Sequence, residues 1–286
     1  MLKRIITGAA FALVMLAGVY FQGWPMLAIL TFCMFVSVYE MCRALENTGA
    51  KPMRWVSYLF CALTAAAHVS SRLLPQDQSL HLSMTALLLS TLAAMSYLVF
   101  RGREALDCLT ASLFPLLYPG LLYLVMMELL RLKNAAAVTV ALVIALFAAS
   151  INDVFALFTG MLLGRHKLAP ELSPKKTIEG SIGGLIASTL FAMAVPALVR
   201  LIFAGNVNVV ASLDTLPPTW AFACLGLLGG ALSQVGDLSA SMVKRHCGIK
   251  DYGKLLPGHG GVMDRMDGVL FCSAVCYIFF NLVGLG

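Results

Sequence analysis

Charged side chains are scarce in this sequence of 286 residues. Only 12% of the residues are Asp, Glu, Lys or Arg, and 60% are hydrophobic, whereas about 25% of the residues are charged in an ordinary soluble domain. This scarcity excludes a cytosolic globular protein and leaves no room for a sizeable soluble domain. Because a membrane-spanning helix needs about 20 mostly apolar residues, the chain has the length for up to about ten spans with their connections.

Three further patterns are missing. The eight cysteines show no paired CxxC spacing for zinc, so we interpret them as small hydrophobic residues of the spans. There is no internal repeat or low-complexity tract, although repeated halves are common in transporters. The apolar run after Lys3-Arg4 ends without a clean small-x-small cleavage site, so we expect a retained first span rather than a signal peptide.

Hydropathy in a window of about 19 residues predicts about nine membrane-spanning helices. The predicted ranges are 5–22, 24–42, 53–71, 79–99, 110–130, 135–163, 178–199, 219–243 and 266–285. We therefore expect an all-α, polytopic integral membrane protein. The N-terminal region, 1–134, contains about five of the spans. The C-terminal region, 135–286, contains about four, and polar residues and glycines accumulate there.

The distribution of basic residues predicts the orientation, because Lys and Arg concentrate in short cytoplasmic loops. With a cytoplasmic N-terminus, sixteen of the twenty Lys and Arg residues fall on the inner side. The four on the outer side are Arg72, Arg131, Lys133 and Arg200. The two long basic loops, 164–177 and 244–265, then face the cytoplasm. The net charge of +6 is a modest excess that indicates the orientation of the chain in the membrane. We expect no nucleic-acid partner.

Four carboxylates are predicted to lie at one depth near the inner membrane face. Asp153 and Asp237 each lie 18 residues into their spans, which is about 27 Å at 1.5 Å per residue. Asp264 and Asp267 begin the last span on one side of a helix. These acids could simply neutralise neighbouring Lys and Arg side chains. Their clustering instead favours a Mg²⁺ site that faces phosphates, since Mg²⁺ takes one or two carboxylates with water and substrate phosphate.

The two basic loops have features that bind anions. In the run from Pro257 to Gly261, glycines precede a helix N-terminus, where backbone N–H groups favour negative charge. His259 is open to three roles, as a metal ligand, an acid or a hydrogen-bonding group, but no second His or Cys accompanies it for catalytic zinc. Ser173-Pro174-Lys175-Lys176-Thr177 predicts a turn with Thr177 as the N-cap of the next span. Contact with anionic lipid is an alternative role for its lysines.

The segment from Ser241 to Asp267 resembles the signature of the phosphatidate cytidylyltransferases, also called CDP-diacylglycerol synthases. In this segment Ser241-Met242-Val243-Lys244-Arg245 is followed by Lys250-Asp251 and then by the run from Pro257 to Asp267. Residues 164–170, 173–180 and 235–238 are also similar to blocks of that family. The pattern departs at Asn152-Asp153-Val154, where the family usually has small residues, and this leaves room for an altered substrate preference.

The resemblance implies transfer of a cytidylyl group from CTP to phosphatidate, which gives CDP-diacylglycerol and pyrophosphate for phospholipid synthesis. It also implies Mg²⁺, with a second metal or a monovalent cation as an option, membrane lipids as partners, and a homodimer. The location would be the inner (cytoplasmic) membrane, with the active site facing the cytoplasm. The implied catalytic residues are Asp237, Asp264, Asp267, Lys250, Asp251 and His259. The implied metal ligands are Asp237 and Asp264, with Asp267, Asp251 and Asp153 as further candidates. The implied substrate-binding residues are Lys175, Lys176, Ser173, Thr177, Lys244, Arg245, Arg265, Gly260 and Gly261.

Three other functions stay open at this point. A CTP-dependent kinase of a polyprenol or phytol would act on an alcohol and would need a general base. An ion or solute transporter would use Asp153 and Asp237 as coupling sites, but it predicts carboxylates at the bilayer midplane and a repeat. A non-catalytic membrane scaffold that kept the fold is the third.

Overall fold

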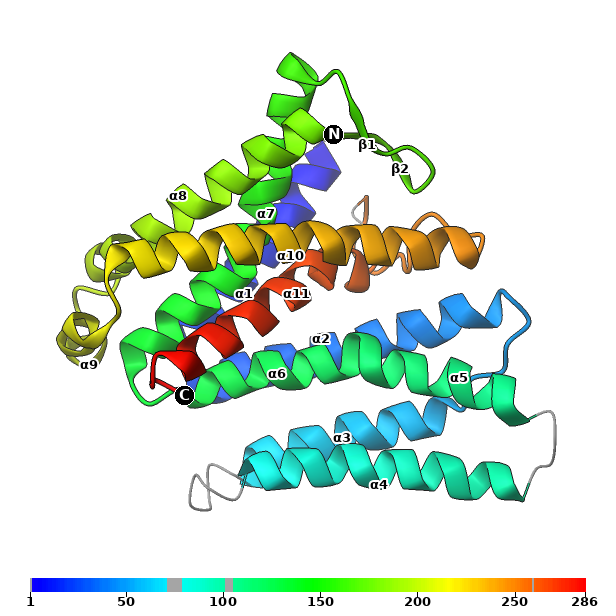
Figure 1. Ribbon diagram of the computed structural model, residues 1–286. Helices are drawn as coiled ribbons and strands as arrows, with labels where there is room; N and C mark the ends of the chain where they lie inside the picture. Colours follow the sequence, from blue (N-terminus) through cyan, green and yellow to red (C-terminus); the bar gives the residue numbers. More distant parts are fainter. Residues whose placement is uncertain (1, 71–78, 101–104, 259) are drawn as a thin grey trace. The chain divides into compact units, whose positions relative to one another are not determined.

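Helices form nearly all of the described chain in the computed structural model, which covers residues 2–70, 79–100, 105–258 and 260–286 (Figure 1). The helices are α1 (Leu2–Phe21), α2 (Gly23–Glu46), α3 (Arg54–Ser70), α4 (Ser79–Val99), α5 (Ala105–Pro115), α6 (Leu122–Glu128), α7 (Ala135–Leu163), α8 (Ile178–Ile202), α9 (Val207–Ser212), α10 (Thr219–His246) and α11 (Met263–Leu282). The strands are β1 (Lys167–Ala169) and β2 (Ser173–Thr177). The predicted helical membrane fold is confirmed.

Six helical stretches of the described residues are long and apolar enough to cross a membrane. They are Gly23–Glu46, Asp107–Arg131, Ala135–Leu163, Ile178–Ile202, Thr219–His246 and Met263–Leu282. Shorter apolar stretches, Ile6–Phe21 and Leu82–Tyr97, lie within α1 and α4. Each of the nine predicted ranges falls largely on helix, but the number of nine spans and the cytoplasmic N-terminus stay predictions.

The fifth predicted range, 110–130, is not one regular helix. The chain passes from α5 through a π-helical turn, Leu116–Leu121, into α6, and Tyr118 has non-helical backbone angles. Pro119 has no N–H to donate and its ring crowds the preceding turn, which accounts for the irregularity. Gly120 lies against the ring of Phe60 on α3, where a Cβ would come within 3.0 Å of the ring.

The chain divides into two compact units, which are described separately. The first contains residues 1–9, 27–127 and 244–264, and the second contains 10–26, 128–243 and 265–286. This grouping differs from the predicted regions 1–134 and 135–286, because the loop 244–264 packs with N-terminal helices. The signature segment identified in the sequence is therefore shared between the two units.

In the first unit, α3 packs along α4, and α5 contacts both. The largest fully buried side chains include Tyr123, Phe60 and Met34. Buried polar groups find partners: the hydroxyls of Ser37 and Tyr123 lie 2.9 Å apart, and Ser112 accepts from the Met53 N–H at 2.7 Å. Burial of a polar group is costly unless it is hydrogen-bonded, so these pairs fix how the helices meet.

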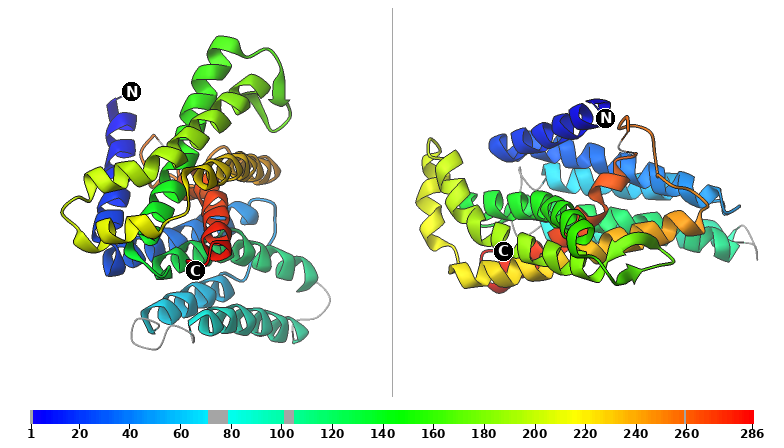
Figure 2. Two further views of the ribbon diagram at one scale, coloured as in Figure 1. Left: turned by 60° about the vertical axis from the view of Figure 1, so that its left-hand side comes forward. Right: turned by 90° about the horizontal axis from the view of Figure 1, so that it is seen from above.

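In the second unit, α7 and α8 form a closely packed pair joined by the antiparallel β1–β2 hairpin (Figures 1 and 2). Small residues permit the approach. A Cβ on Gly183 would overlap the side chain of Thr159, and one on Gly184 would overlap Asn152. The sequence predicts a turn here and not a hairpin. The two strands have only three and five residues, and β2 contains Pro174, so they show no alternating pattern of polar and apolar residues.

Candidate functional site

A pocket of about 610 Å³ opens in the second unit between α7, the β1–β2 hairpin, α8 and α10. Its lining includes the charged or amide side chains of Asp153, Lys167, Lys175, Lys176, Gln234 and Asp237. Leu157 and Met161, both exposed, contribute an apolar wall from α7. Two predicted carboxylates and two predicted lysines are therefore brought together with an apolar surface.

The two carboxylates of this pocket and the lysine that pairs with one of them come from three different elements. Asp153 lies on α7, Asp237 on α10, and Lys176 on β2. The ammonium of Lys176 forms an ion pair with the carboxylate of Asp237, and each side chain keeps about a quarter of its surface exposed, at 26% and 24%. A partly exposed ion pair at a pocket wall can exchange one partner for a ligand, because neither group is sealed from solvent.

Thr177 fixes the end of β2 to the helices. Its side-chain oxygen accepts from the Gly180 N–H at 3.1 Å, which confirms the predicted N-cap of α8. A Cβ on Gly160 of α7 would lie 2.7 Å from this oxygen, so the glycine permits the approach. The hydroxyl of Thr177 thus has a structural partner, and Ser173, also predicted to bind substrate, lines the pocket.

Glu179, in the first turn of α8, contacts the start of the hairpin and was not among the predicted site residues. Its carboxylate accepts from the backbone N–H of Arg165 at 3.0 Å and lies 2.7 Å from Nδ1 of His166. These contacts hold the start of the hairpin against the first turn of α8. A Glu two residues after a Thr N-cap, preceded by a short basic loop, was the available signal.

A buried amide network supports the pocket and was also missed. The Nδ2 of Asn152 donates to the Gly230 carbonyl at 3.0 Å, and Nε2 of Gln234 donates to Oδ1 of Asn152 at 2.9 Å. Gln234 also bonds Ser181 through its oxygen and its amide nitrogen. The network links α7, α8 and α10 directly beside Asp153. Its sequence signal is the occurrence of Asn and Gln inside apolar spans.

Asp264 lies in the first unit at the start of α11, in a different environment. Its Oδ1 accepts from Nζ of Lys244 at 2.9 Å, and its Oδ2 accepts from the N–H groups of Tyr252 at 2.8 Å and Gly261 at 2.9 Å. The side chain is only 4% exposed. Gly260 has φ +82°, and a Cβ there would lie 2.7 Å from Oδ2, so a glycine is required at this turn.

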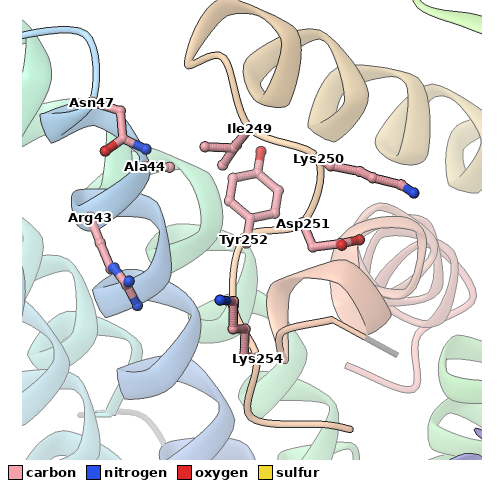
Figure 3. A pocket seen from close by; sticks show the side chains of 9 residues that line it. Arg43, Ala44, Asn47, Ile249, Lys250, Asp251, Tyr252 and Lys254 are labelled. Atoms are coloured by element: carbon pink, nitrogen blue, oxygen red, sulfur yellow. The ribbon is translucent and has the colours of Figure 1, made fainter. Parts of the chain in front are cut away.

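A second, smaller pocket of about 330 Å³ lies in the first unit between α2 and the loop after α10. Arg43 on α2 and Asn47 just after it line the pocket opposite the backbone that carries Lys250 and Lys254. Figure 3 shows the Lys250 and Asp251 side chains extending away from Arg43 in that view. Both of these predicted residues are exposed.

The family model for the cytidylyltransferase family matches residues 2–283. The chain belongs to the cytidylyltransferase family. This membership confirms the resemblance found in the sequence.

Several curated relatives of the family are similar to this chain, and those described here are named phosphatidate cytidylyltransferase. The protein of Brucella abortus biovar 1 (strain 9-941) is 45% identical over 128 residues, which is 45% of this chain and 42% of the relative. The Thermotoga maritima protein is 40% identical over 131 residues, 46% and 45% of the two chains. The Staphylococcus aureus (strain COL) protein is 40% identical over 121 residues, 42% and 41%. The matches thus span less than half the length of these relatives.

The other predicted site residues of this cytidylyltransferase-family chain differ in how deeply they are buried. Asp267 is buried on α11, where its Oδ1 accepts from the Gly268 N–H at 2.8 Å. A Cβ on Gly236 of α10 would lie 2.6 Å from the Asp267 carbonyl oxygen, so the two helices approach closely there. Arg245 and Arg265 are exposed. His259 lies outside the described residues.

Two of the predicted metal ligands, Asp153 and Asp237, line the larger pocket. In the ranges that the structure describes, no three His, Cys, Asp or Glu side chains gather into a cage for a metal ion. Mg²⁺ rarely needs such a cage, because it is commonly held by one or two carboxylates together with substrate phosphates and water. Asp153 and Asp237, which line one pocket beside lysines, fit a Mg²⁺ ion bound in that way.

Proposed function

We propose that this protein transfers a cytidylyl group from CTP to phosphatidate and releases CDP-diacylglycerol and pyrophosphate. The observation that carries the proposal is the larger pocket, in which two carboxylates and three lysines share one cavity with an exposed apolar helix face. Membership of the cytidylyltransferase family and the printed names of the relatives support it. These observations favour it over a polyprenol or phytol kinase, a transporter and a scaffold.

The reaction makes modest demands on acid–base chemistry. A phosphate-monoester oxygen of phosphatidate bonds to the α-phosphorus of CTP, while the bond from that phosphorus to the bridging oxygen breaks and pyrophosphate leaves. Because a phosphate monoester has its second pKa near 6, the nucleophile is already ionised at neutral pH. The protein therefore has to bring two polyanions together and stabilise the charge that develops on the phosphates.

The lysines of the pocket suit that task. Lys167, Lys175 and Lys176 can bind phosphate oxygens, since an ammonium presents three donors and a full positive charge. Asp153 and Asp237 would hold Mg²⁺, which would neutralise phosphate charge when bound. The roles predicted for Asp264, Asp267, Asp251, Lys250, His259 and the other signature residues stay predictions.

The apolar wall of the pocket fits a lipid substrate. Leu157 and Met161 expose their side chains on α7, a helix long and apolar enough to span a membrane. Acyl chains could lie along this face while the phosphate enters the polar side of the pocket. Placement of the pocket at the cytoplasmic face of the inner membrane, with a homodimer as the assembly, is part of this proposal.

The test is an assay of the purified full-length protein with labelled CTP, Mg²⁺ and phosphatidate in detergent micelles. We expect a labelled CDP-lipid, which chelation of Mg²⁺ abolishes, and a large loss in Asp237→Asn. Asp214→Asn is the matched control, because that exposed carboxylate pairs with Arg200 outside the pocket. Labelled product formed only with an isoprenoid alcohol, or equal activity in wild type and Asp237→Asn, would overturn the assignment.

A further inference from the structure

Glu40 is a buried carboxylate that the proposed reaction does not use. It lies on α2, and the residue is only 3% exposed. Its Oε1 accepts from the Val262 N–H at 3.2 Å, and its Oε2 accepts from the Met263 N–H at 2.9 Å. These partners are 222 and 223 residues away in the sequence, and all three residues belong to the first unit.

The two N–H groups that Glu40 binds are at the beginning of α11. The first N–H groups of a helix have no partner within the helix, and a negative charge beside them interacts favourably with the helix dipole. Burial of a carboxylate is costly unless strong hydrogen bonds compensate for lost hydration. Glu40, on another helix, therefore provides the acceptors for two N–H groups at the start of α11.

Two glycines make space for this carboxylate. A Cβ on Gly253 would overlap Oε1 of Glu40, and a Cβ on Gly261 would overlap both carboxylate oxygens. The loop before α11 is thus shaped around the carboxylate. This arrangement gives a physical reason for glycine at two positions where φ is not in the left-handed region.

Glu40 and Asp264 bind neighbouring peptide groups. The N–H of Gly261 donates to Asp264, and the next two N–H groups along the chain donate to Glu40. Three consecutive N–H groups are therefore taken by two carboxylates. A shift of this turn would move Asp264 relative to Lys244 and Tyr252, because Asp264 follows the turn directly.

We propose that Glu40 is a positioning residue for cytidylyl transfer, and that it acts by fixing the turn 261–263 so that Asp264 keeps its contacts. The inference rests on the proposed function and on the catalytic role predicted for Asp264. Glu40 itself touches no substrate in this assignment. Its effect reaches the reaction through the backbone.

The kinetic test compares two Glu40 variants with a matched control on the same helix. Glu40→Leu removes both acceptors, and we expect kcat per folded molecule to fall by about 100-fold, as for other displaced catalytic groups. Glu40→Gln keeps one acceptor oxygen and should lose only about tenfold in kcat. Glu46→Gln, which alters an ion pair with Arg54, should stay within about twofold of wild type.

A different result is expected if Glu40 only stabilises the start of α11 and has no effect on the reaction. In that case Glu40→Leu would lower the unfolding midpoint while folded molecules kept the wild-type kcat and KM for CTP. Rates are therefore measured well below the unfolding midpoint of each variant and divided by the folded fraction. An unchanged kcat in Glu40→Leu overturns the proposal, as does failure of Glu40→Gln to retain more activity than Glu40→Leu.

A double-mutant cycle guards against failure of a single variant to fold. Gly261→Ala should lower kcat because the new methyl group displaces the Glu40 carboxylate. In the Glu40→Ala background the methyl group gains space, so Gly261→Ala should cost less than about twofold beyond Glu40→Ala alone. Multiplication of the two single losses would overturn the proposal.

A measurement that needs no activity separates this inference from the proposed function. Hydrogen–deuterium exchange of peptides covering 260–264 should be faster in Glu40→Leu than in wild type and unchanged in Glu46→Gln. Unchanged exchange in Glu40→Leu overturns the inference even if the wild-type protein makes CDP-lipid. A wild-type protein that makes no CDP-lipid would instead overturn the proposed function and, with it, the kinetic part of this inference.

Discussion

Asp237 and Asp264 carry the same chemical group next to a lysine, but the structure gives them different surroundings. Asp237 lines a pocket in the second unit, pairs with Lys176 and leaves 24% of its side chain exposed. Asp264 lies in the first unit, is 4% exposed, and accepts from Lys244 and two backbone N–H groups. From the sequence both residues are predicted to be metal ligands. In the structure they differ in burial and in the number of groups that bind their carboxylates.

A ligand can therefore reach Asp237, whereas Asp264 holds its own loop in place. A partly exposed carboxylate with one cationic partner can bind a ligand without disturbing the backbone around it. A carboxylate that holds a lysine and two peptide groups is part of the loop architecture, and its removal leaves buried donors without partners. Four substitutions test this difference between Asp237 and Asp264, and the largest effect is expected for Asp264→Asn.

Asp264→Asn should damage both activity and stability. An amide has one acceptor oxygen in place of two, so at least one of the three donors loses its partner, and hydrogen bonds to charged groups contribute about 1.5–3 kcal/mol each. We expect activity close to background and a clearly lower unfolding midpoint, measured by thermal unfolding in detergent. An unchanged midpoint would show that the buried contacts of Asp264 contribute little to stability.

Asp237→Asn should damage activity alone. Removal of the charge should lower activity by about 100-fold or more, since electrostatic groups at a reacting phosphate contribute at this level. Its partly exposed ion pair contributes less than about 1 kcal/mol to stability, so the unfolding midpoint should match wild type. Equal thermal losses in Asp237→Asn and Asp264→Asn would remove the contrast between the two sites.

Gln234→Leu tests whether the pocket depends on the amide network below it. The substitution leaves Oδ1 of Asn152 and the Ser181 carbonyl without the Gln234 amide, which should cost about 1–3 kcal/mol of stability. We expect a lower unfolding midpoint and a moderate loss of activity that follows the displacement of Asp153. Wild-type stability in this variant would contradict a supporting role for the network.

Glu46→Gln should have the smallest effect. Glu46 accepts from Nε of Arg54 at 2.7 Å, and both side chains are about one third exposed. Exposed ion pairs contribute about 0.2–1 kcal/mol, so stability and activity should both stay near wild type. A large loss of stability or activity would show that the exposed Glu46–Arg54 ion pair contributes as much as the buried or pocket-lining carboxylates.

Much of the secondary structure could be predicted from local sequence. The apolar run from Ala135 to Leu163 gives α7 with the predicted bounds, and the Thr177 N-cap follows from a Thr before an apolar run. The signature from Ser241 to Asp267 pointed to the family, which the family match confirms. The β1–β2 hairpin and the π-helical turn Leu116–Leu121 were not predicted, because neither has a periodic pattern.

The helical membrane class and the family follow from the sequence alone, and the roles of the individual carboxylates and lysines stay predictions. Hydropathy, capping and motif spacing depend on residues close together in the chain, so they can be recognised without a fold. The folded chain was needed to show that Asp237 borders an open pocket, that Asp264 is enclosed, and that Glu40 binds the start of α11. These facts depend on burial and on contacts between residues as much as 223 positions apart, and such contacts leave no local pattern in the sequence.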